Sequence, residues 1–200
     1  TGTPVFEAYG MSECSTFISS SPARPTATAG YVQDGRTIAL LGDNGPVARG
    51  RVGQIAIHRN DPGLMLGYLD APDETAARYQ DDWFLTGDLA QMDADGAITY
   101  LGRVDDMMNA GGHRVSPVEV EEAMTSHPDI AEAAVCTVQV RTEVSVIAGF
   151  YTSTDMIDEE HLRRFLAERL ATYKQPRILI RHSALPRGAN NKLLRRVLRT

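Results

Sequence analysis

The sequence predicts a mixed α+β protein in which a strand-rich first half precedes a compact domain of alternating helices and strands. Gly, Pro, Ser and Thr interrupt short apolar runs throughout the first half, which is typical of short strands in a barrel-like or meandering sheet. From Gly102 onward, helix-capping patterns alternate with β-branched runs, as in a compact α+β domain. The chain has 200 residues, 42% of them hydrophobic and 23% charged, which is enough for one large domain or two small ones.

Strands of the first half are expected at four apolar, β-rich runs, namely 37–41, 54–58, 83–92 and 97–101. A short helix is expected over 70–79, because acidic residues and Pro72 fall in its first turn. The segment Asp93-Ala-Asp-Gly96 is similar to the start of a calcium loop, but no Glu stands at the twelfth position of that loop. We therefore expect a hairpin turn there.

The second half contains two clear helix starts. Ser116-Pro-Val-Glu119 is a capping box with proline at the first helical position, so a helix is expected from about 117 to 126. His127-Pro128 ends it, because the residue before proline avoids the helical region. Asp158 is expected to cap a second helix with an apolar stripe. Strands are expected at 133–138, 144–150 and 177–182, and a terminal basic helix at 191–198.

Composition excludes several classes of protein. The longest apolar run, residues 144–151, is far shorter than the roughly 20 residues of a membrane-spanning helix. Cys14 and Cys136 are too far apart in sequence to indicate a disulfide framework or a zinc site. Since no secretory signal follows Thr1, we expect a reducing, cytoplasmic location.

Charge is distributed unevenly along the chain. Residues 161–200 carry 11 Lys or Arg and one acid, Glu168, within a protein whose net charge is −6. Such a segment could bind nucleic acid, a lipid surface or the phosphates of a small molecule, or could simply be a solvated helix face. Aromatic residues are not interleaved with these charges as in single-strand binders, so nucleic acid is the weaker hypothesis.

Two short stretches of the first half could contact a nucleotide. Tyr9-Gly-Met-Ser-Glu13 places a hydroxyl beside a carboxylate in a glycine-containing loop, and such a carboxylate suits Mg²⁺ bound to a phosphate. Leu85-Thr-Gly-Asp-Leu89 leaves one carboxylate near a strand end, where it could accept hydrogen bonds from two ribose hydroxyls. Taken alone, each stretch is more typical of an ordinary turn than of a nucleotide site.

Three stretches of the second half are more specific together. Residues 102–121 read Gly-Arg-Val-Asp-Asp-Met-Met-Asn-Ala-Gly-Gly-His-Arg-Val-Ser-Pro-Val-Glu-Val-Glu, and the double glycine would let a ligand pass close to the backbone. Tyr173-Lys-Gln-Pro176 and Leu185-Pro-Arg-Gly-Ala-Asn-Asn-Lys192 follow. The chain has only two lysines, both in these stretches, against 18 arginines. Taken alone, this is no more than a hint of a specific role for a compact ammonium.

In order and spacing, these five stretches resemble the later core motifs of the adenylate-forming enzymes, which include acyl-CoA synthetases, peptide-synthetase adenylation domains and luciferases. Residues 102–117 resemble the acyl-CoA synthetase branch more than the peptide-synthetase branch, which usually has Lys-Ile-Arg-Gly there. The resemblance covers essentially the whole chain.

This resemblance implies a nucleotide site built from positions scattered along the chain. Tyr9 is expected to lie against adenine, Ser12 near the α-phosphate, and Asp88 on the ribose hydroxyls. Arg103 is expected to support the nucleotide beside it, and Arg114 to approach phosphate. The implied nucleotide-binding positions are Tyr9, Gly10, Met11, Ser12, Asp88, Arg103 and Arg114. Ser12 replaces the commoner Thr but keeps the hydroxyl.

Further roles follow from the same resemblance. Glu13 is the expected Mg²⁺ ligand, and Gly111 and Gly112 are expected to line the channel for the pantetheine of coenzyme A. Asp105 matches the hinge about which the small domain rotates. Lys192 matches the lysine of the first half-reaction, although Asn191 stands where the family usually has Gly. The implied cofactors are ATP, Mg²⁺ and coenzyme A.

The resemblance also implies a domain organisation. Residues 1–102 are expected to be the C-terminal part of the large domain with a small barrel-like subdomain, 103–106 the hinge, and 107–200 the mobile C-terminal domain. The family's phosphate loop is expected upstream of Tyr9, so we expect these residues to be part of a longer synthetase and to be inactive alone.

The expected reaction is the ATP-dependent joining of a carboxylic acid to coenzyme A, with release of AMP and pyrophosphate. Two alternatives remain open: an adenylation domain that loads a carrier protein, and a non-catalytic nucleotide-binding fragment. Expected partners are small molecules, without nucleic acid or a membrane span. The choice between aryl and fatty acids, and the oligomeric state, stay open.

Overall fold

The computed structural model describes residues 6–19, 28–142 and 144–199, and the chain divides into two compact units. The N-terminal unit comprises Thr1–Asp105 and the C-terminal unit Asp106–Thr200. The division falls inside the expected hinge segment, whose function as a hinge stays a prediction. In the described parts of the chain, no helix is long and apolar enough to cross a membrane.

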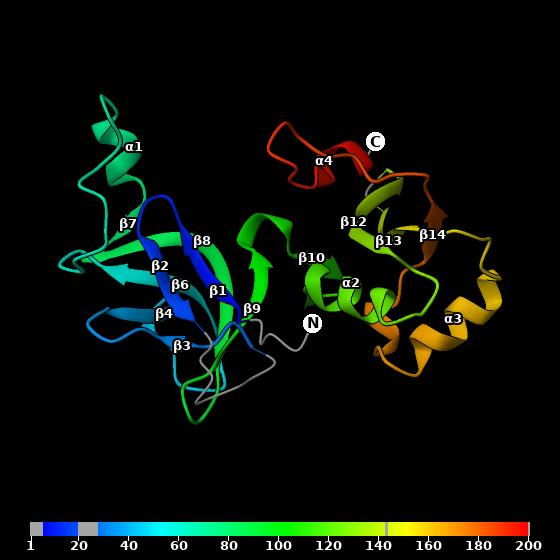
Figure 1. Ribbon diagram of the computed structural model, residues 1–200, viewed down its shortest axis with the longest axis horizontal. Helices are drawn as coiled ribbons and strands as arrows, with labels where there is room; N and C mark the ends of the chain where they lie inside the picture. Colours follow the sequence, from blue (N-terminus) through cyan, green and yellow to red (C-terminus); the bar gives the residue numbers. More distant parts are fainter. Residues whose placement is uncertain (1–5, 20–27, 143, 200) are drawn as a thin grey trace. The chain divides into compact units, whose positions relative to one another are not determined.

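Antiparallel strands dominate the N-terminal unit (Figure 1). The larger sheet has the strand order β5-β4-β6-β8-β7, with β9 added to β8. Its strands are β4 (Ile38–Gly42), β5 (Gly45–Pro46), β6 (Val52–His58), β7 (Tyr79–Gln80), β8 (Trp83–Met92) and β9 (Ile98–Arg103). The smaller sheet comprises β1 (Ala8–Met11), β2 (Ser15–Ser19) and β3 (Tyr31–Val32). A bridge between Gly30 and Ile98 joins the two sheets, which share one buried core.

The hairpin of β8 and β9 has the turn that the sequence predicts. The Asp93 carboxylate accepts hydrogen bonds from the backbone N–H groups of Gly96 and Ala97, at 3.0 and 2.7 Å. Gly96 has φ +98°, which only glycine adopts without strain. The expected helix over 70–79 is the shorter α1 (Pro72–Ala76), with proline in its first turn.

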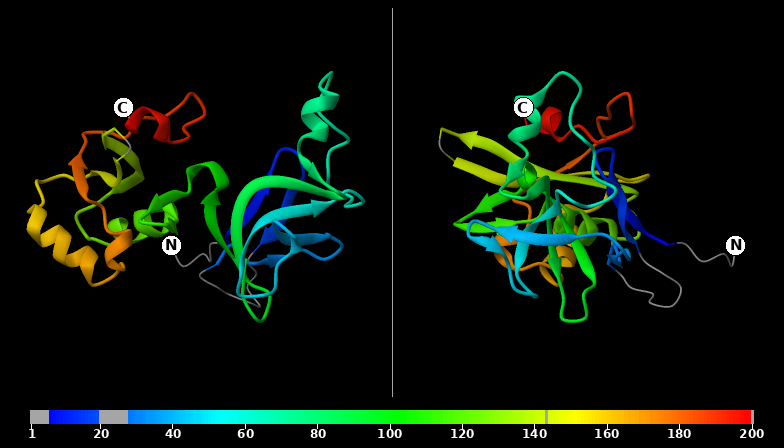
Figure 2. Two further views of the ribbon diagram at one scale, coloured as in Figure 1. Left: turned by 180° about the vertical axis from the view of Figure 1, so that it is seen from behind. Right: turned by 90° about the vertical axis from the view of Figure 1, so that its left-hand side faces the viewer.

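Helices cover both faces of a three-stranded sheet in the C-terminal unit (Figures 1 and 2). Antiparallel β12 (Glu132–Arg141) and β13 (Val144–Thr152) pair along their length, and β14 (Ile178–Arg181) joins β13 in parallel. The helices are α2 (Pro117–Thr125), α3 (Glu159–Ala167) and α4 (Arg195–Leu198). The fold class is therefore the expected mixed α+β.

Alternate side chains of β12 separate two cores. Val135 packs with α2 and α3 on one face, whereas Cys136 packs with Leu198 of α4 on the other. Both long helices start as predicted: the Glu119 N–H donates to Ser116 Oγ at 3.2 Å, and Asp158 caps α3 in the same way. Side-chain alternation along the strand thus places α4 opposite α2 and α3.

Two expectations about local structure are wrong. Residues 9–13, expected to be a loop, begin in strand β1 and turn only after Met11. The expected helix over 191–198 is confined to α4, because Asn191 has φ +60° and Arg187 pairs with Leu193 in a bridge. Such a positive φ is incompatible with a continuous right-handed helix.

Candidate functional site

The carboxylate of Asp88 is the centre of a hydrogen-bonded cluster in the N-terminal unit. Asp88 is 6% exposed and lies on β8. Tyr9 from β1 donates its hydroxyl to Oδ2. Tyr100 donates to Oδ1 at 3.4 Å, and Arg103 Nη1 to the same oxygen at 3.3 Å. Strand β1 and the β8–β9 hairpin, which are distant from each other in sequence, therefore meet at one buried carboxylate.

Strand register explains this convergence. In the β8–β9 hairpin Asp88 lies directly opposite Arg103, and a bulge between Leu89 and Ala90 separates this pair from the hairpin turn. Thr86 Oγ1 accepts the Asp88 backbone N–H at 3.1 Å, and the Thr86 carbonyl accepts a hydrogen bond from Arg103. Between them, Gly87 has φ +82°, and a Cβ there would come within 2.7 Å of Arg103 Nη2. Glycine at position 87 thus leaves room for the guanidinium.

The cluster has capacity for a ligand hydroxyl. A carboxylate offers about four acceptor positions, and the three donors named above leave roughly one of them free. Burial raises the pKa of the Tyr9 hydroxyl, and the Asp88 charge raises it further, so Tyr9 stays a neutral donor. Two ligand hydroxyls could bind the Asp88 carboxylate at the same time only if one of the three protein donors were displaced.

Glu13 lies in the turn after β1, where its carboxylate accepts the hydroxyl of Tyr68 at 2.9 Å. Among the described residues, no group of three or more His, Cys, Asp or Glu side chains could hold a metal ion by itself. One carboxylate nevertheless fits Mg²⁺, which usually binds one or two protein carboxylates together with phosphate oxygens and water. Ser12 beside it is exposed. Gly10 lies so close to the Ser15 backbone that no side chain would fit there.

Gly111 and Gly112 form the tight turn of a hairpin in the C-terminal unit. They connect β10 (Met108–Ala110) to β11 (His113–Val115) with φ values of +60° and +86°. Both values are those of a two-residue hairpin turn that strongly favours glycine. A Cβ on either residue would meet open space, so it is the positive φ and not a lack of room that favours glycine here. The turn therefore exposes its backbone.

A hollow of about 370 Å³ opens beside this turn, lined by Gly111, Val146, Thr172, Tyr173 and Arg177 among others. The Tyr173 ring stacks on His113 with centroids 4.3 Å apart. Next to Tyr173, the Lys174 ammonium pairs with Glu119 at 2.5 Å. Lys174 is therefore tied to α2, whereas Arg177 contributes a positive charge to the wall of the hollow.

Lys192 lies near the end of a short hairpin, residues 187–193, which we call the Lys192 hairpin. Its side chain is exposed, and among the described residues no carboxylate pairs with its ammonium. Asp105 is also exposed, in the single 3-10 turn Val104–Asp106 at the boundary of the two units. Arg114 is exposed on β11.

The predicted positions therefore fall into separate groups. Tyr9 and Arg103 both contact Asp88. Met11, Ser12 and Glu13 lie on and after β1, and in the described part of the chain they form no hydrogen bond with Asp88. The C-terminal unit carries the remaining positions Gly111, Gly112, Arg114 and Lys192.

Sequence reasoning missed Tyr100 and Tyr68, the phenols that contact Asp88 and Glu13. For Tyr100 part of the signal existed, because the turn at 93–96 predicts that Asp88 and Tyr100 lie on paired strands. The bulge between Leu89 and Ala90, which shifts their register, has no such signal. Tyr68 lies 55 residues from Glu13 in an irregular segment, where no periodicity could indicate its partner.

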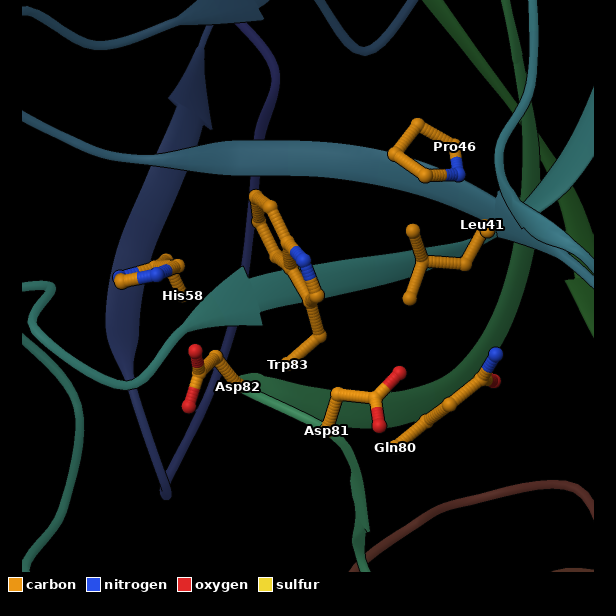
Figure 3. A pocket seen from close by; sticks show the side chains of 8 residues that line it. Leu41, Pro46, His58, Gln80, Asp81, Asp82 and Trp83 are labelled. Carbon is orange, nitrogen blue, oxygen red and sulfur yellow. The ribbon is translucent and has the colours of Figure 1, made fainter.

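A smaller hollow in the N-terminal unit, of about 200 Å³, lies beside Trp83 (Figure 3). The Trp83 ring meets His58 edge-to-face at 5.1 Å, and Asp81 and Asp82 lie on the same side of the hollow. None of the residues expected to bind nucleotide lines it, so it does not belong to the candidate site.

Comparison with known proteins gives a consistent result. Residues 119–192 match the family described as AMP-binding enzyme C-terminal domain. The 2-succinylbenzoate–CoA ligase of Geobacillus kaustophilus is 36% identical over 204 residues, covering 99% of this chain and 41% of the relative. The oxalate–CoA ligase of Arabidopsis thaliana is 29% identical, covering 98% of this chain and 39% of the relative.

Solved structures agree with the sequence matches. The o-succinylbenzoate CoA synthetase of Bacillus subtilis, in complex with its acyl-adenylate intermediate, has a TM-score of 0.90 and 32% identity over 100% of this chain and 42% of its own. The anthranilate CoA ligase AuaEII, in complex with anthranoyl-AMP, has a TM-score of 0.91 and 29% identity over 100% of this chain and 40% of its own.

Fold and sequence matches thus define a mixed α+β protein whose C-terminal unit carries an AMP-binding enzyme C-terminal domain. The chain belongs to the adenylate-forming enzymes, and its residues 119–192 are their AMP-binding C-terminal domain. It spans about two fifths of the length of the curated relatives it matches.

Proposed function

We propose that this chain is part of an AMP-forming acid–CoA ligase. In the first step a carboxylate oxygen attacks the α-phosphate of ATP, and the bond to pyrophosphate breaks to leave an acyl-adenylate. In the second step the thiol of coenzyme A attacks the acyl carbon, its proton is lost, and AMP leaves. The names of the relatives, which are CoA ligases of 2-succinylbenzoate and oxalate, support this reaction.

One observation carries the proposal, namely the buried carboxylate of Asp88 at the centre of Tyr9, Tyr100 and Arg103. In a largely desolvated site such a carboxylate binds hydroxyl donors strongly, because hydrogen bonds to a charged acceptor exceed neutral ones. The ribose of ATP carries two adjacent hydroxyls. Asp88 is the proposed ribose ligand, and the ring of Tyr9 is the proposed surface for adenine.

Glu13 is the proposed ligand of Mg²⁺, which would neutralise phosphate charge when bound. The structure of the Bacillus subtilis synthetase in complex with ATP and a magnesium ion supports the use of Mg²⁺. Ser12, beside Glu13, is proposed to donate its hydroxyl to the α-phosphate. Both side chains follow β1, so Tyr9, Ser12 and Glu13 would contact successive parts of one nucleotide.

Lys192 is the proposed catalytic residue of the first step. A carboxylate and an α-phosphate repel each other, and an ammonium between them stabilises the charge that develops in the transition state. The exposed side chain of Lys192, without a paired carboxylate among the described residues, leaves this charge available to substrate.

In the second step the thiol needs access to the same acyl carbon. We assign the turn at Gly111 and Gly112, with its neighbouring hollow of about 370 Å³, to coenzyme A. Both glycines expose backbone without a side chain, which suits the close approach of a slender pantetheine arm. Asp105 is the proposed hinge that presents Lys192 and this turn in succession, and Arg114 is proposed to contact phosphate.

The acid remains a matter for experiment, because the matched relatives act on different acids according to their names. A carrier protein in place of coenzyme A is the alternative outcome. We place the enzyme in the cytoplasm, which agrees with the two buried, free cysteines.

The test uses the parent protein with ATP, Mg²⁺ and a panel of aryl, dicarboxylic and fatty acids. AMP release in multiple turnovers only with coenzyme A supports the proposal. Pyrophosphate exchange without turnover on coenzyme A indicates a carrier protein instead. The absence of activity with every acid contradicts the ligase assignment. In the active parent, Lys192→Ala is expected to abolish adenylation while thioester formation from supplied acyl-adenylate continues.

A further inference from the structure

The Lys192 hairpin has few internal hydrogen bonds, so contacts with other elements of the C-terminal unit must orient it. The Gly188 N–H donates to the Lys192 carbonyl at 2.8 Å, and Arg187 bridges to Leu193. These bonds shape the hairpin but do not fix its direction relative to the rest of the C-terminal unit. Arg187, its first residue, pairs with a carboxylate on β12, and Arg195, which follows it, pairs with a carboxylate on α2.

Arg195, three residues after Lys192, makes the stronger of these two attachments. Its guanidinium donates three hydrogen bonds to the Glu121 carboxylate, at 2.7, 2.8 and 3.1 Å. The side chains are only 21% and 15% exposed. Glu121 on α2 also accepts the Val135 N–H of β12 at 2.8 Å. One carboxylate therefore joins α2, β12 and α4.

The second attachment is more exposed. Arg187 donates to the Asn191 carbonyl within the hairpin at 2.9 Å and to Glu132 of β12 at 2.6 Å. Its side chain is 36% exposed and that of Glu132 45%, so solvent screens this pair. Of the two attachments, the one through Glu121 has the better geometry and the lower exposure.

Net stability does not explain a pair such as Glu121 and Arg195. Burial raises the pKa of Glu121 even though the arginine opposes the shift, so desolvation outweighs the attraction. Buried ion pairs contribute little net stability on average, but a planar guanidinium held on two oxygens has a fixed direction. The pair is suited to orient a segment.

We propose that Glu121 is a positioning residue for Lys192: by holding Arg195 it fixes the Lys192 hairpin in the orientation that adenylation requires. This inference rests on the proposed function, in which Lys192 acts in the first step only. A displacement of about 1 Å at a reacting group can cost roughly a hundred-fold in rate. We call the ion pair of Glu121 and Arg195 the clamp. Its loss should therefore slow adenylation and leave thioester formation unchanged.

The experiment compares Glu121→Gln with Glu122→Gln in the parent enzyme. Glutamine at 121 keeps the size and one acceptor oxygen but loses the charge and the second acceptor. Glu122 is the neighbouring exposed acid on α2 and serves as the matched control. The expected result is a fall of about 10- to 100-fold in kcat for acyl-adenylate formation with Glu121→Gln, with little change in the KM for ATP. Thioester formation from supplied acyl-adenylate and coenzyme A should keep its rate.

Arg195→Lys provides a second variant, since an ammonium keeps the charge but cannot form the two-oxygen contact. It should show the same selective loss. Equal losses in both half-reactions, or an unchanged adenylation rate in either variant, would overturn the positioning role.

Amide hydrogen exchange provides a readout that does not depend on activity. The Gly188 and Leu194 amides, bonded to Lys192 and Pro186, should exchange at least about ten-fold faster in Glu121→Gln, with α3 unchanged. Unchanged exchange would contradict the clamp even if the parent proved to be no ligase. Faster exchange in a protein without adenylation activity would instead refute only the proposed function.

Discussion

The substitution Tyr9→Phe deletes one hydroxyl and tests how much the hydrogen bond from Tyr9 to Asp88 contributes to the free energy of unfolding of the N-terminal unit. Phenylalanine keeps the edge-to-face contact with Phe17, whose ring centroid is 5.3 Å away. It removes the donor to Asp88 Oδ2, leaving Tyr100 and Arg103 at 3.4 and 3.3 Å on the other oxygen. A hydrogen bond to a charged acceptor contributes about 1.5–3 kcal/mol, so we expect a loss of about 2 kcal/mol.

The assay is urea unfolding followed by tryptophan fluorescence. Trp83 is the only tryptophan and lies on β8, so its emission reports the N-terminal unit alone. A unit of this size has a urea slope of roughly 1–1.5 kcal/mol per M, so the midpoint should fall by about 1.5 M. The slope should not change, because the exposed surface is nearly the same.

Tyr79→Phe is the matched control. This phenol lies in the same unit and its ring contacts Phe84 at 5.6 Å, but its hydroxyl forms no hydrogen bond with the described residues. We expect a change below about 0.5 kcal/mol, as for surface substitutions away from buried networks. Equal shifts of the urea midpoint in the two variants would refute the stabilising hydrogen bond from Tyr9 to Asp88.

Three further changes are expected to have defined effects. Gly87→Ala should cost the N-terminal unit roughly 2 kcal/mol in urea unfolding, because φ is +82° and the new Cβ would come within 2.7 Å of Arg103 Nη2; an unchanged midpoint would refute this. Burial raises the pKa of the Cys14 thiol to about 12, so iodoacetamide at pH 8 should label the folded protein about a thousand-fold more slowly than the urea-unfolded chain. Since the folded state keeps this proton while the unfolded chain loses it, stability should also decrease as pH rises above about 9, and a rising midpoint would contradict the assignment. Ser116→Ala removes the acceptor for the Glu119 N–H and should cost about 1 kcal/mol, seen as faster amide exchange in α2; Ser126→Ala, at the other end of that helix, is the control.

Local signals predicted much of the fold. The capping serine at 116 and the turn at 93–96 both act through bonds between residues close in sequence, and both are confirmed. The region 191–198 has a helical composition, but the positive φ of Asn191 and the bridge from Arg187 shorten the helix. That bridge depends on the chain returning to Arg187, which composition does not encode.

The candidate site was predicted less completely. Asp88 was identified because its motif is contiguous, whereas its contact with Tyr9 spans 79 residues and depends on how two sheets meet. Glu121 and Arg195 are 74 residues apart and carried no signal, since single charges on amphipathic helices are common. Long-range polar contacts follow from tertiary packing, which pattern reasoning does not reach.

The two lysines differ in a way that has a practical consequence. Lys174 is 22% exposed and paired with Glu119, whereas the Lys192 side chain is exposed and has no such partner among the described residues. An amine-reactive dye should therefore distinguish the two side chains by rate. These 200 residues contain no lysine besides Lys174 and Lys192, and such reagents do not attack the 18 arginines. A fluorophore could therefore be attached to this chain at the Lys192 hairpin without engineered cysteines. Such a label would turn the Lys192 hairpin of this chain into a spectroscopic reporter of its C-terminal unit.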